Sequence, residues 1–342
     1  MGSLPPHDPT NSNTFRIYAS FCPKKKAKSN QYLSSYDPTN NSWSHVGPIP
    51  GLLENHVLKG FALVSLGEFV YVIGGRLCRC DRQIEADVVI RPDVLRFDVR
   101  TGEWSTCAPV TVSRFDFACD ACDGKIYVAG GQCDLASARG TAAAEVYDPL
   151  MDRWTPLPEM TTARYKCVGV TWQGRFHVVG GFAASAVERS SAEAYDVERR
   201  DWNLAPGMWQ LDVPPNQIVA TGGRLFSSGD CLQNWKGHIE EYDGKLKLWN
   251  IVERSHLPDL LSLVADGLPA QILYLTMSSI GSQLYFLMGY QVLMGNDNLK
   301  MVSVAHMFDT APLTGEGWRS FEPIEEEGDK ELCCHSCVVQ LS

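Results

Sequence analysis

The sequence predicts an all-β protein in which six similar units, each of four short antiparallel strands, form a ring. Three observations support this prediction: an aromatic-Asp pattern followed by tryptophan, a glycine pair after strand-like runs, and a C-terminal segment that resembles earlier segments. A unit of this size cannot bury an apolar face alone, so neighbouring units must pack against one another.

The first pattern is a Tyr-Asp or Phe-Asp pair followed by a tryptophan, and in five of the six copies the tryptophan lies six residues after the aspartate. We place the aromatic residue on the third strand and the tryptophan at the start of the fourth, where large rings fill the contact between units. The aspartate starts the turn between these strands. The six copies are Tyr36-Asp37 with Trp43, Phe97-Asp98 with Trp104, Tyr147-Asp148 with Trp154, Tyr195-Asp196 with Trp202, Tyr242-Asp243 with Trp249, and Phe308-Asp309 with Trp318.

The second pattern is a strand-like run that ends in a glycine pair. We expect these glycines where the second strand leaves the crowded centre of the ring, a place that favours a residue without Cβ. The runs are Tyr71 to Gly75, Tyr127 to Gly131 and Phe176 to Gly181, with degenerate copies at Leu225 to Asp230 and Leu284 to Gly289.

Taken together, these spaced elements resemble the kelch repeat over nearly the whole chain, and the chain resembles small stand-alone plant kelch-repeat proteins. The resemblance implies a six-bladed kelch β-propeller. No F-box, BTB, zinc-finger or helical dimerisation segment is visible in the sequence. We therefore expect any function to come from the propeller itself.

The two ends of the chain predict how the ring closes. Phe15 to Ser20 looks like a second strand without a first, and His335 to Leu341 resembles the first strands near Phe117 and Tyr165. The C-terminal strand is thus expected to complete the N-terminal blade and to remove open edges. The predicted organisation is a disordered tail at 1–13 and a single propeller at 14–342, with blades at about 14–50 plus 333–342, 55–110, 111–160, 161–209, 210–256 and 267–324.

Charge and addressing signals exclude some classes of function. The formal net charge of −10 argues against a nucleic-acid partner, which would favour a basic face. No signal peptide and no apolar run long enough to span a bilayer is present. We expect a monomer in the cytoplasm, and a nuclear location is left open.

The loops are the expected site of function. The loop after each second strand and the loop before each first strand emerge on one face of the ring, and the resemblance implies that this face binds a partner or substrate. The residues that it would place there are Arg76, Arg114, Phe115, Asp116, Gln132, Arg164, Tyr165, Phe182, Asp230, Trp235, Tyr290 and His335.

Arg114 and Arg164 are equivalent, because each lies sixteen residues before the first glycine of its pair. In some kelch proteins, arginines at this point bind acidic peptides through bidentate hydrogen bonds. The alternative is that they brace neighbouring loops. Blade two has Leu58 at this offset and blade five has Val213, which argues against a strongly anionic ligand in the pocket.

The predicted function is a binding scaffold whose loop face recognises a protein partner. The alternative is an enzyme that binds a small molecule at the mouth of the channel, with acid/base chemistry of the isomerase or cyclase kind from Arg114, Asp116, Tyr165, Asp230 or His335. The sequence contains none of the hydrolase, metalloprotease or phosphate-binding motifs that would decide between them.

Twelve cysteines raise the question of metal binding. A zinc site needs four convergent ligands, and Cys78, Cys80, Cys334 and His335 could lie on one face of adjacent blades. Buried or surface thiols are the simpler interpretation. We predict no metal and no cofactor, and without a secretory signal we expect no structural disulfide.

Overall fold

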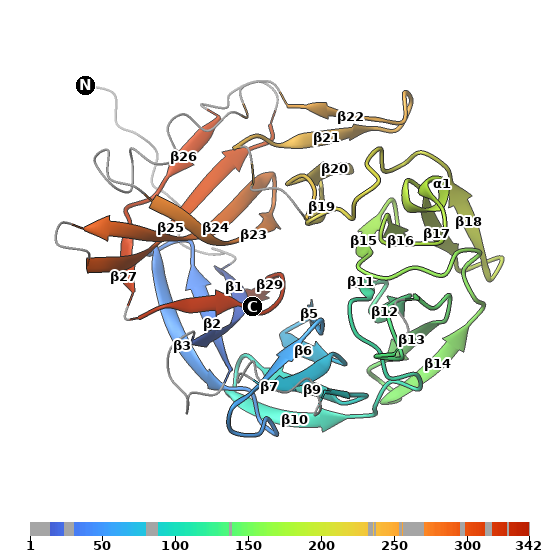
Figure 1. The fold of residues 1–342 in the computed structure, drawn as a ribbon, viewed down its shortest axis with the longest axis horizontal. Helices are drawn as coiled ribbons and strands as arrows, with labels where there is room; N and C mark the ends of the chain where they lie inside the picture. Colours follow the sequence, from blue (N-terminus) through green and yellow to red (C-terminus); the bar gives the residue numbers. More distant parts are fainter. Residues whose placement is uncertain are drawn as a thin grey trace, which may run out of the picture.

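The computed structural model places almost all of the described chain in antiparallel strands, which form sheets around a common centre (Figure 1). We number the blades one to six along the chain. The residues described are 14–23, 31–79, 88–136, 139–231, 235, 237–252, 255, 270–294, 298–311, 317–326 and 328–341. The predicted tail at 1–13 and Cys80 lie outside them.

Blades three, four and five each form one four-stranded sheet from consecutive strands. A short helix, α1 (Ala186–Arg189), lies between the second and third strands of blade four. The strands are β11 (Ala118–Cys122), β12 (Lys125–Ala129), β13 (Ala144–Asp148) and β14 (Arg153–Leu157); β15 (Val168–Trp172), β16 (Arg175–Val179), β17 (Ala192–Asp196) and β18 (Asp201–Ala205); β19 (Ile218–Thr221), β20 (Arg224–Ser227), β21 (Glu240–Asp243) and β22 (Leu248–Ile251).

Blades two and six depart from this plan. Blade two carries an additional three-stranded sheet built from its loops, and blade six has much longer strands and a fifth strand paired with β25. Their strands are β5 (Ala62–Leu66), β6 (Phe69–Ile73), β9 (Val94–Asp98) and β10 (Glu103–Cys107), with β4 (His56–Lys59), β7 (Arg76–Arg79) and β8 (Val89–Ile90) in the additional sheet; and β23 (Ala270–Ile280), β24 (Gln283–Met294), β25 (Asn298–Asp309), β26 (Trp318–Ser320) and β27 (Ile324–Glu326).

Blade one is assembled from both ends of the chain. It contains β1 (Thr14–Pro23), β2 (Tyr32–Asp37) and β3 (Ser42–Pro48). The C-terminal strands β28 (Lys330–Leu332) and β29 (Cys337–Leu341) both pair antiparallel with β1. This is the pairing that the sequence predicted for the C-terminal strand.

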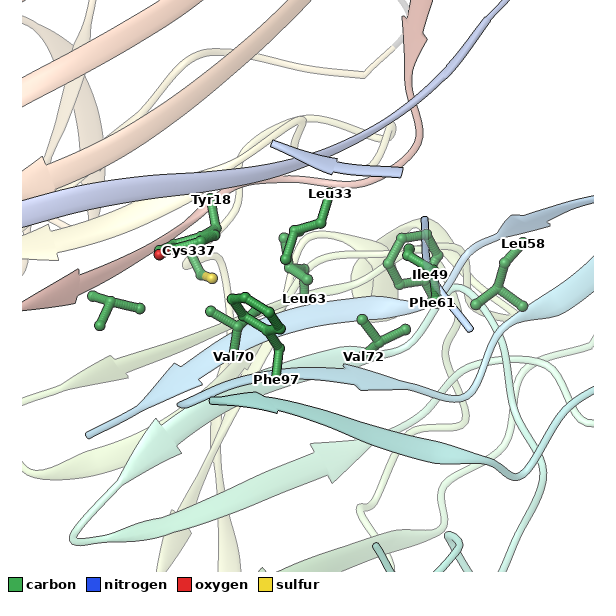
Figure 2. Packing of buried hydrophobic residues seen from close by; sticks show 11 residues of the cluster. Tyr18, Leu33, Ile49, Leu58, Phe61, Leu63, Val70, Val72, Phe97 and Cys337 are labelled. Carbon is green, nitrogen blue, oxygen red and sulfur yellow. The ribbon is translucent and has the colours of Figure 1, made fainter. Parts of the chain in front are cut away.

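The apolar core lies between blades. Figure 2 shows one such contact, where Tyr18, Leu33 and Cys337 of blade one face Val70 and Phe97 of blade two. Further clusters join blade two to three and blade three to four. These contacts confirm the predicted packing of neighbouring units and, with the sheets, the predicted all-β propeller fold.

The repeated aspartates and tryptophans behave as predicted. All six aspartates accept a backbone N–H two residues ahead, as Asp148 does from Leu150 at 3.0 Å. The indole Nε1 of Trp154 donates to the backbone oxygen of Ala108, which follows the last strand of blade two. Trp202 repeats this bond to Pro158 of blade three. Trp249 and Trp318 donate in the same way to Met208 and Ser255, so these four tryptophans both pack on their own blade and bind the preceding one.

The glycine pair permits the close approach of the next blade. Gly130 has a φ of +71°, and a Cβ built on it would lie 2.7 Å from the backbone oxygen of Arg164 in blade four. The N–H of Gly131 donates to that same oxygen at 2.8 Å. Gly74 stands in the same relation to the backbone oxygen of Arg114, where a Cβ would lie at 2.8 Å. Glycine is therefore required here by both backbone conformation and inter-blade contact.

Candidate functional site

The first strands of the blades surround a central cavity of about 620 Å³. Its wall is formed by residues of β5, β11, β15, β19, β23 and β29, which face the centre in Figure 1. We call the end of this channel that is formed by the segments leading into these strands the mouth. The loops predicted to bind a partner surround it.

Arg114 precedes β11 and has no exposed surface. Its Nη1 donates to the backbone oxygens of Gly130 and Ala143 at 2.9 and 2.8 Å, and its Nη2 donates to Glu145 Oε1 at 2.9 Å. Glu145 is also buried, and its other carboxylate oxygen accepts the N–H and hydroxyl of Thr111. This pair ties the segment before the first strand to the ends of the second and third strands.

Arg164 repeats the arrangement in blade four. It is equally buried, and its Nη1 donates to the backbone oxygens of Gly180 and Ser191 at 2.8 and 3.1 Å. Its Nη2 donates to Glu193 Oε1 at 3.2 Å, and Glu193 accepts two hydrogen bonds from Thr161. The Arg164 Nε differs from its counterpart in blade three because it has no acceptor within the described chain.

The two arginines are therefore absent from the cavity wall. A charge removed from water is tolerated only when it is paired and hydrogen-bonded, and both guanidinium groups are held in that way by the protein itself. The prediction that Arg114 and Arg164 contact a partner does not fit this geometry. The alternative, that they brace neighbouring loops, does.

Short backbone bridges join the loops at the mouth. Phe115 pairs with Gln132, and Tyr165 pairs with Phe182, whose rings also pack with centroids 5.3 Å apart. Asp230 makes the equivalent bridge to Pro215. Phe115 and Pro215 are buried, whereas the others are half-buried. These predicted residues do lie around the mouth, and the backbone bridges join each of them to the adjacent loop of its own blade.

Arg76 is held beside the mouth in a different way, although it too is not part of the cavity wall. Its backbone lies in β7, paired with Lys59 on one side and Ile90 on the other. Its guanidinium carbon lies 4.7 Å from the centroid of the Phe115 ring, across the boundary between blades two and three. Within the described residues the side chain makes no hydrogen bond or ion pair, and its buried Nε has no acceptor. Arg76 is thus an ordered cation with unused donors.

Asp116 and Lys166 occupy equivalent positions in blades three and four and both line the cavity. Each has a left-handed backbone, with φ of 54° and 52°, and the N–H of Lys166 donates to the backbone oxygen of Asp116 at 2.7 Å. Burial raises the pKa of Asp116, while the nearby Lys166 and Arg76 charges lower it. No ion pair within 4 Å is formed by Lys166 among the described residues, so its exposed ammonium group is also uncommitted.

His335 lines the cavity on the side of blade one. Protein atoms surround the ring and lower the pKa of His335, opposed by a hydrogen bond with the backbone of Asn216. The surface of the ring is nevertheless open to the channel. The imidazole of His335 is therefore neutral at neutral pH, because its pKa is lowered.

Trp235 and Tyr290 do not line the cavity. Tyr290 is fully buried in blade six, where its hydroxyl contacts Met288 and His306. Trp235 stacks on Phe286 with ring centroids 4.9 Å apart. Their placement at the mouth is corrected here: Tyr290 lies on β24 inside the apolar core of blade six, and Trp235, which lies between β20 and β21 of blade five, packs against that core.

Sequence reasoning missed Lys166 and Asp120. Lys166 follows the predicted Tyr165 directly, and its alignment with Asp116 was the signal that could have found it. Asp120 lies on β11, lines the cavity, and accepts the N–H of Thr171 from the neighbouring β15. Burial raises the pKa of Asp120. It joins two blades and carries no pattern that distinguishes it from other strand residues.

The described residues contain no group of three or more His, Cys, Asp or Glu side chains placed to hold a metal ion. Cys334 and His335 line the cavity, whereas Cys78 lies in β7. The sulfur of Cys78 is near its own backbone, 3.8 Å from the oxygen of Arg76. The fourth member of the predicted group, Cys80, is outside the described part of the chain.

Comparisons with known proteins agree with the repeat. The kelch motif model matches residues 113–161, which correspond to blade three. One F-box/kelch-repeat protein of Arabidopsis thaliana is 34% identical over 184 residues, 53% of this chain and 46% of that protein. Another is 34% identical over 252 residues, 69% of this chain and 66% of that protein. Kelch-like protein 36 of Mus musculus is 28% identical over 208 residues, 60% of this chain and 31% of that protein.

The match therefore spans about half or less of the length of the first curated relatives. No helix in the described part of the chain is both long and apolar enough to cross a membrane.

Proposed function

Because this chain is a kelch-repeat protein, we propose that it is a binding scaffold that recognises a carboxylate-bearing segment of a protein partner at the mouth of its channel. Kelch-repeat relatives support a role in protein interaction. The observation that carries the proposal is the state of Arg76, an ordered cation whose hydrogen-bond donors have no acceptor among the described residues.

Stacking on Phe115 fixes the plane of the Arg76 guanidinium group before a partner arrives. A guanidinium group matches the two oxygens of a carboxylate, and a preformed orientation reduces the conformational entropy lost on binding. Lys166 provides a second free cation, and Asp116 lies within the field of both. An incoming carboxylate would therefore meet two cations, Arg76 and Lys166, near a partly buried aspartate.

The overall charge of −10 opposes an acidic partner at long range. Salt screens such long-range repulsion over about 10 Å, but it screens a partly buried contact much less. We therefore expect the affinity for an acidic segment to rise or stay level as salt increases from low concentration, whereas a purely electrostatic attraction would weaken.

The test compares wild type with Arg76→Ala and Lys166→Ala, using a library of peptides that carry two, one or no carboxylates. Losing one charged hydrogen-bond donor should reduce binding of the acidic peptides by about 1.5–3 kcal/mol. Arg153→Ala, an exposed arginine of β14 near the opposite face, is the matched control. Equal binding by wild type and Arg76→Ala would contradict the proposal.

The cavity volume supports a second candidate, a small-molecule site. A volume of about 620 Å³ lies within the range of roughly 300–1,000 Å³ typical of ligand pockets. Asp116 and His335 could then act as acid and base, as in the enzyme alternative. A thermal-shift screen with small uncharged polyols separates the two, because an enzyme or small-molecule site predicts stabilisation that Asp116→Asn abolishes, whereas the carboxylate-binding scaffold predicts none.

A further inference from the structure

Two cysteines from opposite ends of the chain are in contact near the channel. Cys22 lies in β1, and Cys333 immediately follows β28. A hydrogen bond joins their thiols, and neither cysteine is in a disulfide. We propose that Cys22 and Cys333 are a redox-sensitive pair, which a peroxide oxidises to a disulfide that ties the C-terminal segment covalently to the first strand.

The strand register holds the two sulfurs together. Phe21 pairs with Leu332 and Cys22 pairs with Glu331. Cys333 is the next residue after Leu332, so it lies close to Cys22 along the paired strands. The N–H of Cys333 then donates to the backbone oxygen of Ser20 at 2.8 Å. Backbone hydrogen bonds on both sides of the pair therefore fix its geometry. A disulfide requires such proximity, since thiols that are far apart or point away cannot be joined without backbone movement.

Lys330 anchors the start of the same strand. Its Nζ lies 4.3 Å from the centroid of the Phe21 ring and 5.0 Å from that of Trp43, and it is 2.7 Å from Glu326 Oε1. A buried cation held by aromatic faces and a carboxylate is a strong local restraint. β28 is thereby kept in register against β1, and Cys333 is kept beside Cys22.

The two thiols differ in their access to a peroxide in the channel, and this difference determines which thiol reacts first. Cys333 lines the cavity, whereas Cys22 is almost fully buried. The Cys333 thiol loses its proton, and its thiolate attacks one peroxide oxygen to give a sulfenic acid and water. The Cys22 sulfur then attacks the Cys333 sulfur, and the hydroxyl group leaves as water. Two thiols and one hydrogen peroxide thus give one disulfide and two waters.

The bond would close a loop that contains most of the chain. Constraining so long a loop removes conformational entropy mainly from the unfolded state. It would also prevent β28 from leaving the edge of β1. Oxidation is therefore expected to stabilise the association of the two chain ends without altering the mouth, where Arg76 and Lys166 lie.

The experiment treats full-length protein with hydrogen peroxide and identifies cross-linked peptides by mass spectrometry without reduction. We expect a Cys22–Cys333 peptide, and a melting temperature about 5 °C above that of the reduced protein. Cys22→Ser and Cys333→Ser should lose both effects. Cys133→Ser, which removes an exposed thiol from the β12–β13 loop, should keep both.

The rate offers a second readout that does not depend on the variants. The hydrogen bond with Cys22 and burial raise the pKa of the Cys333 thiol. The charges of Cys22, Cys334 and Glu331 raise this pKa further. The Tyr32 side chain also faces the pair. Because the thiolate is the nucleophile, cross-linking should be faster at pH 9 than at pH 7. Absence of the cross-link in wild type at pH 9, or a dominant cross-link from Cys334 or Cys133, would overturn the proposal.

Discussion

In blades three and four, a buried ion pair holds the segment that leads into the first strand, whereas blade two has leucines at the two equivalent positions. Arg114 with Glu145 and Arg164 with Glu193 make 2.9 and 3.2 Å contacts. In blade two, Leu58 takes the place of the arginine. Leu95 takes the place of the glutamate, because it lies two residues before Phe97 as Glu145 lies two residues before Tyr147. Leu58 belongs to the apolar cluster between blades one and two, and Leu95 packs against that cluster.

A repeated arginine is therefore not by itself evidence of a ligand site. A buried ion pair and a pair of apolar side chains can be nearly equivalent in stability, since the cost of desolvating two charges offsets much of their attraction. Either solution holds the segment that leads into the first strand. Arg76, whose side chain makes no hydrogen bond within the described part of the chain, belongs to the blade that uses leucines.

The largest expected effect comes from breaking one ion pair. Arg114→Leu leaves Glu145 charged and buried with only neutral donors, so we expect a loss of about 3–5 kcal/mol in the free energy of unfolding. Chemical denaturation of wild type and variant measures it. A loss below about 1 kcal/mol would mean that the pair is not a brace.

A glycine at the blade contact gives the next largest effect. Gly130→Ala places a Cβ within 2.7 Å of the Arg164 backbone oxygen and also strains a left-handed residue, so we expect a loss of about 3 kcal/mol. Gly124→Ala has a similar φ of +72° but open space around it. This control should lose only about 1 kcal/mol. Similar losses in the two variants would show that backbone conformation alone matters.

Converting blade three to the chemistry of blade two should give an intermediate effect. The double variant Arg114→Leu with Glu145→Leu removes the unpaired charge, so we expect it to be more stable than Arg114→Leu alone and to lose about 2 kcal/mol relative to wild type. Recovery is incomplete because the N–H groups of Thr111 and Val112 lose their acceptor. A double-mutant cycle from equilibrium unfolding provides the coupling energy; the absence of any recovery would refute the comparison.

The smallest effect on stability is expected for Arg76→Ala. Its side chain stacks on Phe115 but makes no hydrogen bond within the described chain, so its removal should change the free energy of unfolding by about 0.5–1 kcal/mol. Thermal melting beside Arg114→Leu tests the contrast directly. A loss as large as that of Arg114→Leu would make Arg76 another structural brace and would remove the basis for its role in binding.

Much of the fold could be predicted from short, local patterns. Asp148 turns the chain by bonding its own backbone, and Trp154 follows at a fixed distance, so both can be interpreted from the sequence alone. The glycine pairs could be placed for the same reason, since a left-handed backbone restricts residue choice wherever it occurs. The pairing of the C-terminal strand with β1 was also predicted, because its sequence resembles the other first strands.

The site was decided by the tertiary structure. Nothing in the sequence distinguishes Arg114 from Arg76 as a charged residue near the mouth; burial and the presence of Glu145 do so, and both depend on strands far apart in the chain. The same is true of Tyr290, which the long strands of blade six place in its core. Sequence determines which residues can turn, pair or fill a contact, because these are local properties. Whether a charge is free or already neutralised depends on which groups the folded chain brings within hydrogen-bond distance.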